Sequence, residues 1–160
     1  MSSAQDVLRA ARARKVTIAT AESCTGGMII AALTDIAGSS DVVDRGFVTY
    51  SNAAKEQMLG VQAATLGTYG AVSEQVAAEM ARGALARSAA GLVVAVTGIA
   101  GPGGSEHKPE GRVCFGLADA QGVTVETVEF GAVGRANVRQ ATVAHALALL
   151  LRALTAPDQP

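Results

Sequence analysis

A serine lies where a strand is expected to pass into a helix, in the stretch TIATAESCTGGMIIAAL at residues 17–33. One interpretation makes Ser23 the N-cap of that helix, a common position for serine. The other makes it a nucleophile at a strand-to-helix turn, where N–H groups of the first helical turn can stabilise an oxyanion. Gly26 and Gly27 favour the nucleophile, because a glycine in a helix costs about 1 kcal/mol relative to alanine, and a cap does not require it. They would let a substrate approach the backbone closely.

A nucleophilic serine needs a base, and both histidines are poorly placed. His107 lies in a glycine-rich loop, and His145 lies on a helix between alanines. Lys55 would be the third residue of a helix capped by Asn52, where the helix dipole and partial burial favour a neutral amine. The alternative for Lys55 is a solvated surface lysine.

Two further side chains could take part in the reaction. Tyr50 ends a strand five residues before Lys55, so its hydroxyl could relay a proton. Alternatively, it is a rim tyrosine with its hydroxyl in water. Cys24 could itself be the nucleophile, because a helix N-terminus favours a thiolate, although a buried inert cysteine is the commoner case.

Two segments could bind a phosphate or a sugar. The loop TGIAGPGG at residues 97–104 follows a buried strand and offers backbone N–H groups, yet it matches neither GxxxxGK[ST] nor GxGxxG. A plain connector is its alternative. Arg135 and Arg139 stand one turn apart at a helix start, where they could clamp a phosphate or form an exposed basic face. Lys108 is the next candidate for a phosphate contact.

The composition argues against several classes of protein. Among 160 residues, 49% are apolar and 17% charged, which opposes disorder. The net charge is −1 and only 3% of residues are aromatic, which opposes a nucleic-acid partner. Cys24 and Cys114 stand alone, without CxxC or HExxH, so neither a disulfide framework nor a metal site is expected.

The N-terminus is polar and helical rather than a signal peptide. No apolar run approaches the roughly 18 residues of a membrane span. We therefore expect a cytoplasmic protein without a membrane partner. The small apolar faces are compatible with a homodimer, although no heptad or strand-edge pattern decides this.

The elements that would position these residues follow from the hydrophobic periodicity. Helices are expected at residues 4–14, 24–36, 53–60, 73–89 and 134–154, and strands at 16–21, 42–51 and 91–98, with a hairpin at 112–130 that turns at 119–122. Strands and helices in βα order, with a late hairpin, predict an α/β fold: a three-layer α/β/α sandwich around a mixed sheet. We expect one domain over residues 1–160, with 154–160 frayed.

Four motifs in order carry a resemblance to a known family: AESCTGG, VTYSNAAKEQMLGV, GAVSEQVAAEMARGA and AVTGIAGPGG…KPEG. Together they resemble the C-terminal domain of the competence-damage inducible protein CinA, over residues 4 to 154. That family includes stand-alone nicotinamide-nucleotide amidases. One departure is Glu110: the family usually has Lys-Pro-Val-Gly here, whereas this chain has Lys-Pro-Glu-Gly.

The resemblance implies deamidation of nicotinamide mononucleotide to nicotinate mononucleotide and ammonia, in pyridine nucleotide recycling and without a metal or organic cofactor. It implies a serine nucleophile and a tyrosine/lysine pair, at Ser23, Tyr50 and Lys55. Lys55 would deprotonate Ser23 directly or through Tyr50, and N–H groups of residues 24–27 would hold the oxyanion. The substrate is expected to contact Cys24, Thr25, Gly26, Gly27, Thr97, Gly98, Gly101, Arg135 and Arg139. A catalytically inactive ligand-binding or interaction module is the alternative.

Overall fold

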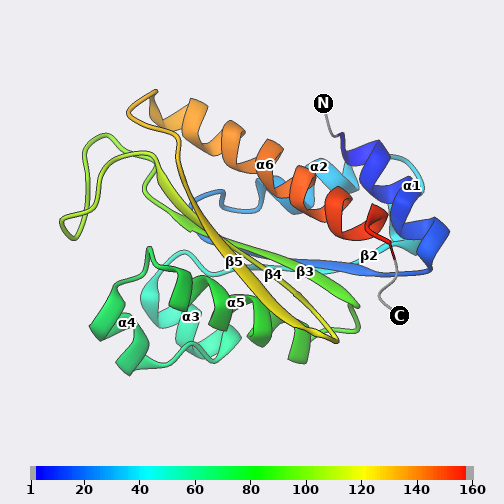
Figure 1. Cartoon of the computed structure of the whole chain (residues 1–160), viewed down its shortest axis with the longest axis horizontal. Helices are drawn as coiled ribbons and strands as arrows, with labels where there is room; N and C mark the ends of the chain where they lie inside the picture. Colours follow the sequence, from blue (N-terminus) through cyan, green and yellow to red (C-terminus); the bar gives the residue numbers. More distant parts are fainter. Residues whose placement is uncertain (1–2, 158–160) are drawn as a thin grey trace.

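A mixed five-stranded sheet forms the centre of the computed structural model, which describes residues 3–157 (Figure 1). Its strands are β1 (Ile18–Glu22), β2 (Val43–Val48), β3 (Leu92–Gly98), β4 (Arg112–Asp119) and β5 (Gly122–Glu129), in the spatial order β2-β1-β3-β4-β5. The first strand runs parallel to both β2 and β3, whereas β4 is antiparallel to β3 and β5. The predicted mixed sheet and late hairpin are thereby confirmed.

Helices cover both faces of this sheet (Figure 1). One layer contains α1 (Ala4–Arg14), α2 (Met28–Thr34) and α6 (Arg135–Thr155), and the other contains α3 (Asn52–Leu59), α4 (Ala63–Tyr69) and α5 (Glu74–Ala86). A short 3-10 helix, η1 (Ser39–Asp41), precedes β2. The three-layer α/β/α sandwich expected from the sequence is confirmed.

The central strands β1 and β3 are buried because helices pack on both of their faces. All five residues of β1 are buried, as are the first six of β3. Their side chains point alternately to the two faces of the sheet and contribute to two apolar cores. One core includes residues of α1, α2 and α6, and the other includes residues of α3 and α5. Since β1, β2 and β3 are parallel, their carboxyl ends meet at one edge of the sheet.

A close contact between α3 and α5 fixes α3 against this framework. A Cβ atom at Gly83 of α5 would lie 1.9 Å from the carbonyl oxygen of Leu59, the last residue of α3. Only glycine allows the two backbones to approach so closely. Lys55, which belongs to α3, is held in place by this packing.

Several element boundaries differ from the sequence predictions; β2, for example, ends at Val48, so Tyr50 follows this strand instead of ending it. The helix expected from residue 24 begins at Met28, because Gly26 and Gly27 have φ values of +58° and +105°, outside the right-handed helical region. The N-cap of α3 is Ser51 rather than Asn52, and its hydroxyl accepts the N–H of Ala54. Helix α6 extends to Thr155, and the end of the segment predicted to fray, 158–160, lies outside the described residues.

The helix α4 was missed by the sequence prediction. Its seven residues include Gly67 and show no buried face, so local propensity for it is weak. A tertiary contact holds it: the carboxylate of Glu79 in α5 accepts the N–H of Gln62 at 2.8 Å and the hydroxyl of Thr65 at 2.6 Å.

Candidate functional site

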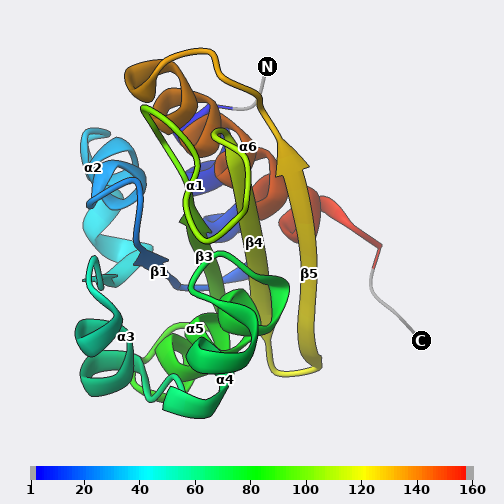
Figure 2. The ribbon, with the colours of Figure 1, turned by 90° about the vertical axis from the view of Figure 1, so that its left-hand side faces the viewer.

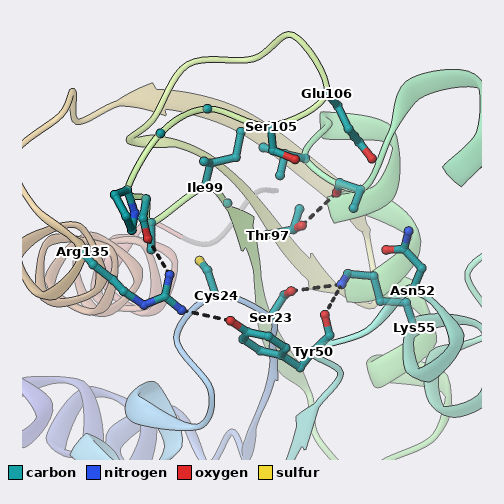
Figure 3. Close-up of a pocket in the computed structure, with 18 residues that line it drawn as sticks. Ser23, Cys24, Tyr50, Asn52, Lys55, Thr97, Ile99, Ser105, Glu106 and Arg135 are labelled. Carbon is teal, nitrogen blue, oxygen red and sulfur yellow. Dashed lines mark hydrogen bonds between the residues drawn. The ribbon is translucent and has the colours of Figure 1, made fainter.

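A cavity of about 440 Å³ opens at the carboxyl ends of the three parallel strands (Figure 3). The loop between β3 and β4 borders it and lies between the two helical layers (Figure 2). Eight predicted site residues line the cavity: Ser23, Cys24, Tyr50, Lys55, Thr97, Gly98, Gly101 and Arg135. Four others do not line it: Thr25, Gly26, Gly27 and Arg139. The sequence prediction missed several lining residues, including Asn52, Val72, Ser105 and Glu106.

The amine of Lys55 lies against the hydroxyl of Ser23. Nζ of Lys55 is 3.0 Å from Oγ of Ser23, and it donates to the backbone carbonyls of Thr49 at 3.1 Å and Tyr50 at 3.2 Å. Ser23 follows β1 directly, while Lys55 reaches over from the first turns of α3 (Figure 3). With Ser51 as N-cap, Lys55 is the fourth helical residue, not the third.

Burial changes the acid–base properties of this lysine. Lys55 is 1% exposed, and no Asp or Glu of residues 3–157 forms an ion pair with it. Loss of solvation lowers its pKa from the ordinary value of 10.5, and the nearby Cys24, where it is ionised, opposes this shift in part. A neutral amine can accept the proton of Ser23 while it still donates to the two carbonyls. The solvated surface lysine is therefore the wrong interpretation.

The hydroxyl of Tyr50 points away from this pair, toward Arg135. Nη2 of Arg135 donates to it at 3.0 Å, and Nη1 donates to the carbonyl of Gly101 at 2.6 Å (Figure 3). Tyr50 is 61% exposed and contacts Lys55 through its backbone carbonyl. A proton relay from Ser23 through the Tyr50 hydroxyl to Lys55 has no hydrogen bond to support it.

Two backbone N–H groups in the turn after Ser23 already make hydrogen bonds within the protein. The N–H of Gly26 donates to the carbonyl of Ser23 at 3.0 Å, and that of Gly27 donates to the carboxylate of Glu22 at 3.2 Å. These two N–H groups are therefore not free for an oxyanion, which corrects the prediction for residues 24–27. Within the described chain, the N–H groups of Cys24 and Thr25 donate to no other residue. The two glycines are needed for their positive φ values rather than for contact with the cavity.

The two arginines of α6 have different surroundings although they are one helical turn apart. Arg139 is half-buried and donates to the carbonyls of Cys24 at 3.1 Å and Thr25 at 3.2 Å. These two hydrogen bonds hold the turn that follows Ser23 against α6. Arg135 is exposed and lines the cavity, so its charge faces the space that a ligand would fill.

Cys24 lines the cavity but is a poor nucleophile. Burial raises the pKa of its thiol to about 11, so the thiolate is scarce at neutral pH. The second cysteine, Cys114, is also buried, and burial raises its pKa as well.

Part of the loop at residues 98–111 is also satisfied internally. The carboxylate of Glu110, where this sequence departs from the family pattern, accepts the N–H of Gly103. The N–H of Ile99 donates to the backbone carbonyl of Arg112 at 2.9 Å. Lys108 donates to the carbonyls of Tyr69 and Val72 at 2.6 Å each and does not line the cavity. Among the described residues, no cluster of three or more His, Cys, Asp or Glu side chains could hold a metal ion.

The comparisons with known proteins identify the family. The model of the CinA C-terminal domain matches residues 1–154. The chain belongs to this family. A CinA-like protein of Chlorobium phaeobacteroides (strain BS1) is 60% identical over 119 residues, which cover 72% of this chain and 28% of that protein. The nicotinamide-nucleotide amidohydrolase PncC of Escherichia coli (strain K12) is 50% identical over 151 residues, covering 94% of this chain and 92% of PncC.

Solved structures of the CinA superfamily share the fold. The competence damage-inducible protein A from Klebsiella pneumoniae has a TM-score of 0.93 and 38% identity, over 97% of this chain and 96% of that one. The competence/damage inducible protein from Agrobacterium tumefaciens has a TM-score of 0.87 and 52% identity, over 94% and 96% of the two chains. No helix of residues 3–157 in this CinA domain combines the length and apolar character needed to cross a bilayer.

Proposed function

We propose that this chain is an amidohydrolase that converts nicotinamide mononucleotide to nicotinate mononucleotide and ammonia, with Ser23 as the nucleophile. The observation that carries the proposal is the 3.0 Å contact between Oγ of Ser23 and the buried amine of Lys55 in the cavity. The near full-length similarity to PncC supports the choice of substrate.

In the proposed reaction, Lys55 is the direct base. Neutral Nζ takes the proton from Oγ of Ser23 as that oxygen attacks the carboxamide carbon. The N–H groups of Cys24 and Thr25, which no other residue occupies, are the candidates to hold the oxyanion. The protonated amine then gives its proton to the leaving nitrogen, and ammonia departs. Water, deprotonated by the same amine, attacks the ester carbon, and the bond to Oγ of Ser23 breaks. The protonated amine returns its proton to that oxygen, which restores the enzyme.

The substrate's phosphate is assigned to Arg135. This guanidinium lines the cavity and is held by Gly101 and Tyr50, so it is oriented before the ligand arrives. The glycine loop would pack around the ribose. The absence of a cofactor, a role in pyridine nucleotide recycling and a cytoplasmic location belong to the same proposal. The single domain over residues 1–160 and a homodimer stay predictions.

Replacement of the nucleophile tests the proposal. Ser23→Ala should reduce the release of ammonia from nicotinamide mononucleotide by about three orders of magnitude or more, with the fold intact. Ser39→Ala is the matched control, since both serines are 8% exposed and Ser39 lies in η1, outside the cavity. Near-normal ammonia release by Ser23→Ala would refute the serine assignment. A wild-type protein that binds the nucleotide without releasing ammonia would instead support an inactive binding module.

A further inference from the structure

A buried carboxylate stands directly before the proposed nucleophile. Glu22 is the last residue of β1 and is 0% exposed, yet the proposed reaction assigns it no part. Buried carboxylates are uncommon and need hydrogen-bond donors to stay ionised. What surrounds Glu22 therefore indicates what it does.

Five donors converge on this carboxylate. Oε1 accepts the hydroxyl of Thr25 at 2.6 Å, the N–H of Ile29 at 2.9 Å and the N–H of Gly27 at 3.2 Å. Oε2 accepts the N–H of Ile30 at 3.0 Å and the hydroxyl of Thr20 at 3.2 Å. Within residues 3–157 no cation forms an ion pair with Glu22. Hydrogen bonds from uncharged donors are therefore what satisfy both of its oxygens.

The carboxylate replaces the missing cap of α2. The N-cap residue, Gly27, has no side chain to bond the free N–H groups of the first turn. Glu22 supplies that acceptor from the end of the neighbouring strand, and so it ties β1 to α2 across the turn that carries Ser23. The N–H of Ser23 is in turn anchored to the carbonyl of Val96 in β3 at 3.1 Å.

We propose that Glu22 is a positioning residue for Ser23. Its carboxylate locks the 23–27 turn to the start of α2 and thereby keeps Oγ of Ser23 within reach of Nζ of Lys55. This inference rests on the proposed function. Misplacement of a reacting atom by about 1 Å can cost a factor of about 100 in rate, so the effect should be large.

The same contacts remove one place where an anion could bind. A free helix start attracts phosphate through its N–H groups and dipole. In α2 these N–H groups already donate to Glu22. The substrate's phosphate must therefore lie elsewhere, in agreement with its assignment to Arg135.

The test compares Glu22→Gln with wild type at two stages. Ammonia release from nicotinamide mononucleotide gives kcat and KM, and the rate at which a fluorophosphonate labels Ser23, followed by mass spectrometry, reports the nucleophile without any nucleotide. We expect kcat and the labelling rate per folded molecule to fall about 100-fold together, with KM nearly unchanged. Thr142→Val is the control, because Thr142 is equally buried but lies in α6 outside the cavity. It should leave both rates unchanged.

Three results would overturn the inference. The first is a labelling rate equal to that of wild type. The second is a fall that matches only the lost folded fraction, which would make Glu22 merely structural. The third is a change in KM alone, which would place Glu22 in substrate binding. If Glu22→Gln does not fold, Thr25→Val removes only the 2.6 Å donor to the carboxylate and should slow labelling less strongly. An unchanged labelling rate in that variant would count equally against the inference.

The two proposals fail in different ways. A wild-type protein that releases no ammonia but is labelled at Ser23 would refute the substrate, and the labelling comparison would still decide the role of Glu22. A wild-type protein that releases ammonia while Glu22→Gln matches it in both rates would refute only the positioning role.

Discussion

The amine of Lys55 makes three contacts, with the hydroxyl of Ser23 and with the backbone carbonyls of Thr49 and Tyr50. A neutral amine satisfies all three, because it donates two hydrogens to the carbonyls and accepts one from the serine. An ammonium ion could also donate to all three, but it would be a buried charge without a counter-ion. The site thus favours the form of lysine that can act as a base.

The pH dependence of the rate should reveal this lysine. Because burial lowers the pKa of Lys55 below 10.5, the neutral fraction increases as pH rises through the lowered value. We expect kcat/KM to increase with pH over that range and then to level off. A pH–rate profile for nicotinamide mononucleotide measures this, with Lys108→Ala as a control lysine outside the cavity. Activity that falls with rising pH over this range would rule out Lys55 as the base.

Stability should depend on pH through the same residue. Between the lowered pKa and 10.5 the unfolded chain binds more protons at Lys55 than the folded chain does, so this residue makes the free energy of unfolding increase with pH. Below the lowered pKa the folded protein must carry a buried charge. Lys55→Met should therefore gain stability relative to wild type as pH falls, while it loses activity. Urea unfolding of both proteins at several pH values measures this. A constant difference in stability would contradict the shift.

The two arginines of α6 should give different kinetic effects. Arg135→Ala removes a charge that faces the cavity and should raise KM for the mononucleotide about 10- to 100-fold. Arg139→Ala releases the carbonyls of Cys24 and Thr25 and should lower kcat and the melting temperature instead. The sequence analysis did not distinguish the two arginines and offered both as contacts of the phosphate. Steady-state kinetics of the two variants decide between them, and an unchanged KM for Arg135→Ala would move the phosphate site elsewhere.

Two glycine substitutions separate the cost of a side chain at a positive φ from the effect of a side chain in a helix with open space around it. Gly27→Ala places a side chain at φ +105° and should destabilise the protein by about 1–3 kcal/mol. Gly67→Ala in α4 should stabilise it by up to about 1 kcal/mol, because Gly67 is helical and a Cβ there meets nothing within 4 Å. Thermal or urea unfolding gives both values. Equal effects of the two substitutions would contradict the account of the turn.

The role of Lys55 can be predicted from the sequence more readily than the role of Glu22, and the reason is physical. A lysine in the first turns of a helix opposes the dipole and is visible as a local conflict. Glu22 merely ends an apolar strand, and its donors at Gly27, Ile29 and Ile30 become neighbours only when the turn folds. The signal available in the sequence was the position of Glu22, a charged residue directly after a strand expected to be buried on both faces.

Tertiary contacts also explain the remaining differences. Arg135 and Arg139 occupy equivalent places in the helical pattern, and only the packing of α6 against the Ser23 turn and the glycine loop distinguishes them. Ser51 and Asn52 are both good caps, so local preference alone could not choose between them. The alternation of strands and helices, by contrast, depends on periodicity, which was sufficient for the layers and the hairpin.

The proposed nucleophile and base are 32 residues apart in the chain, on elements that are brought together by the sheet, by a shared apolar core and by the close approach of α3 to α5. A chain emerging from the ribosome therefore has no activated serine until β1, β2, α3 and α5 have assembled. Hydrolytic capacity should appear in one step with the packed core during refolding, so that partly folded molecules cannot attack amides or esters around them.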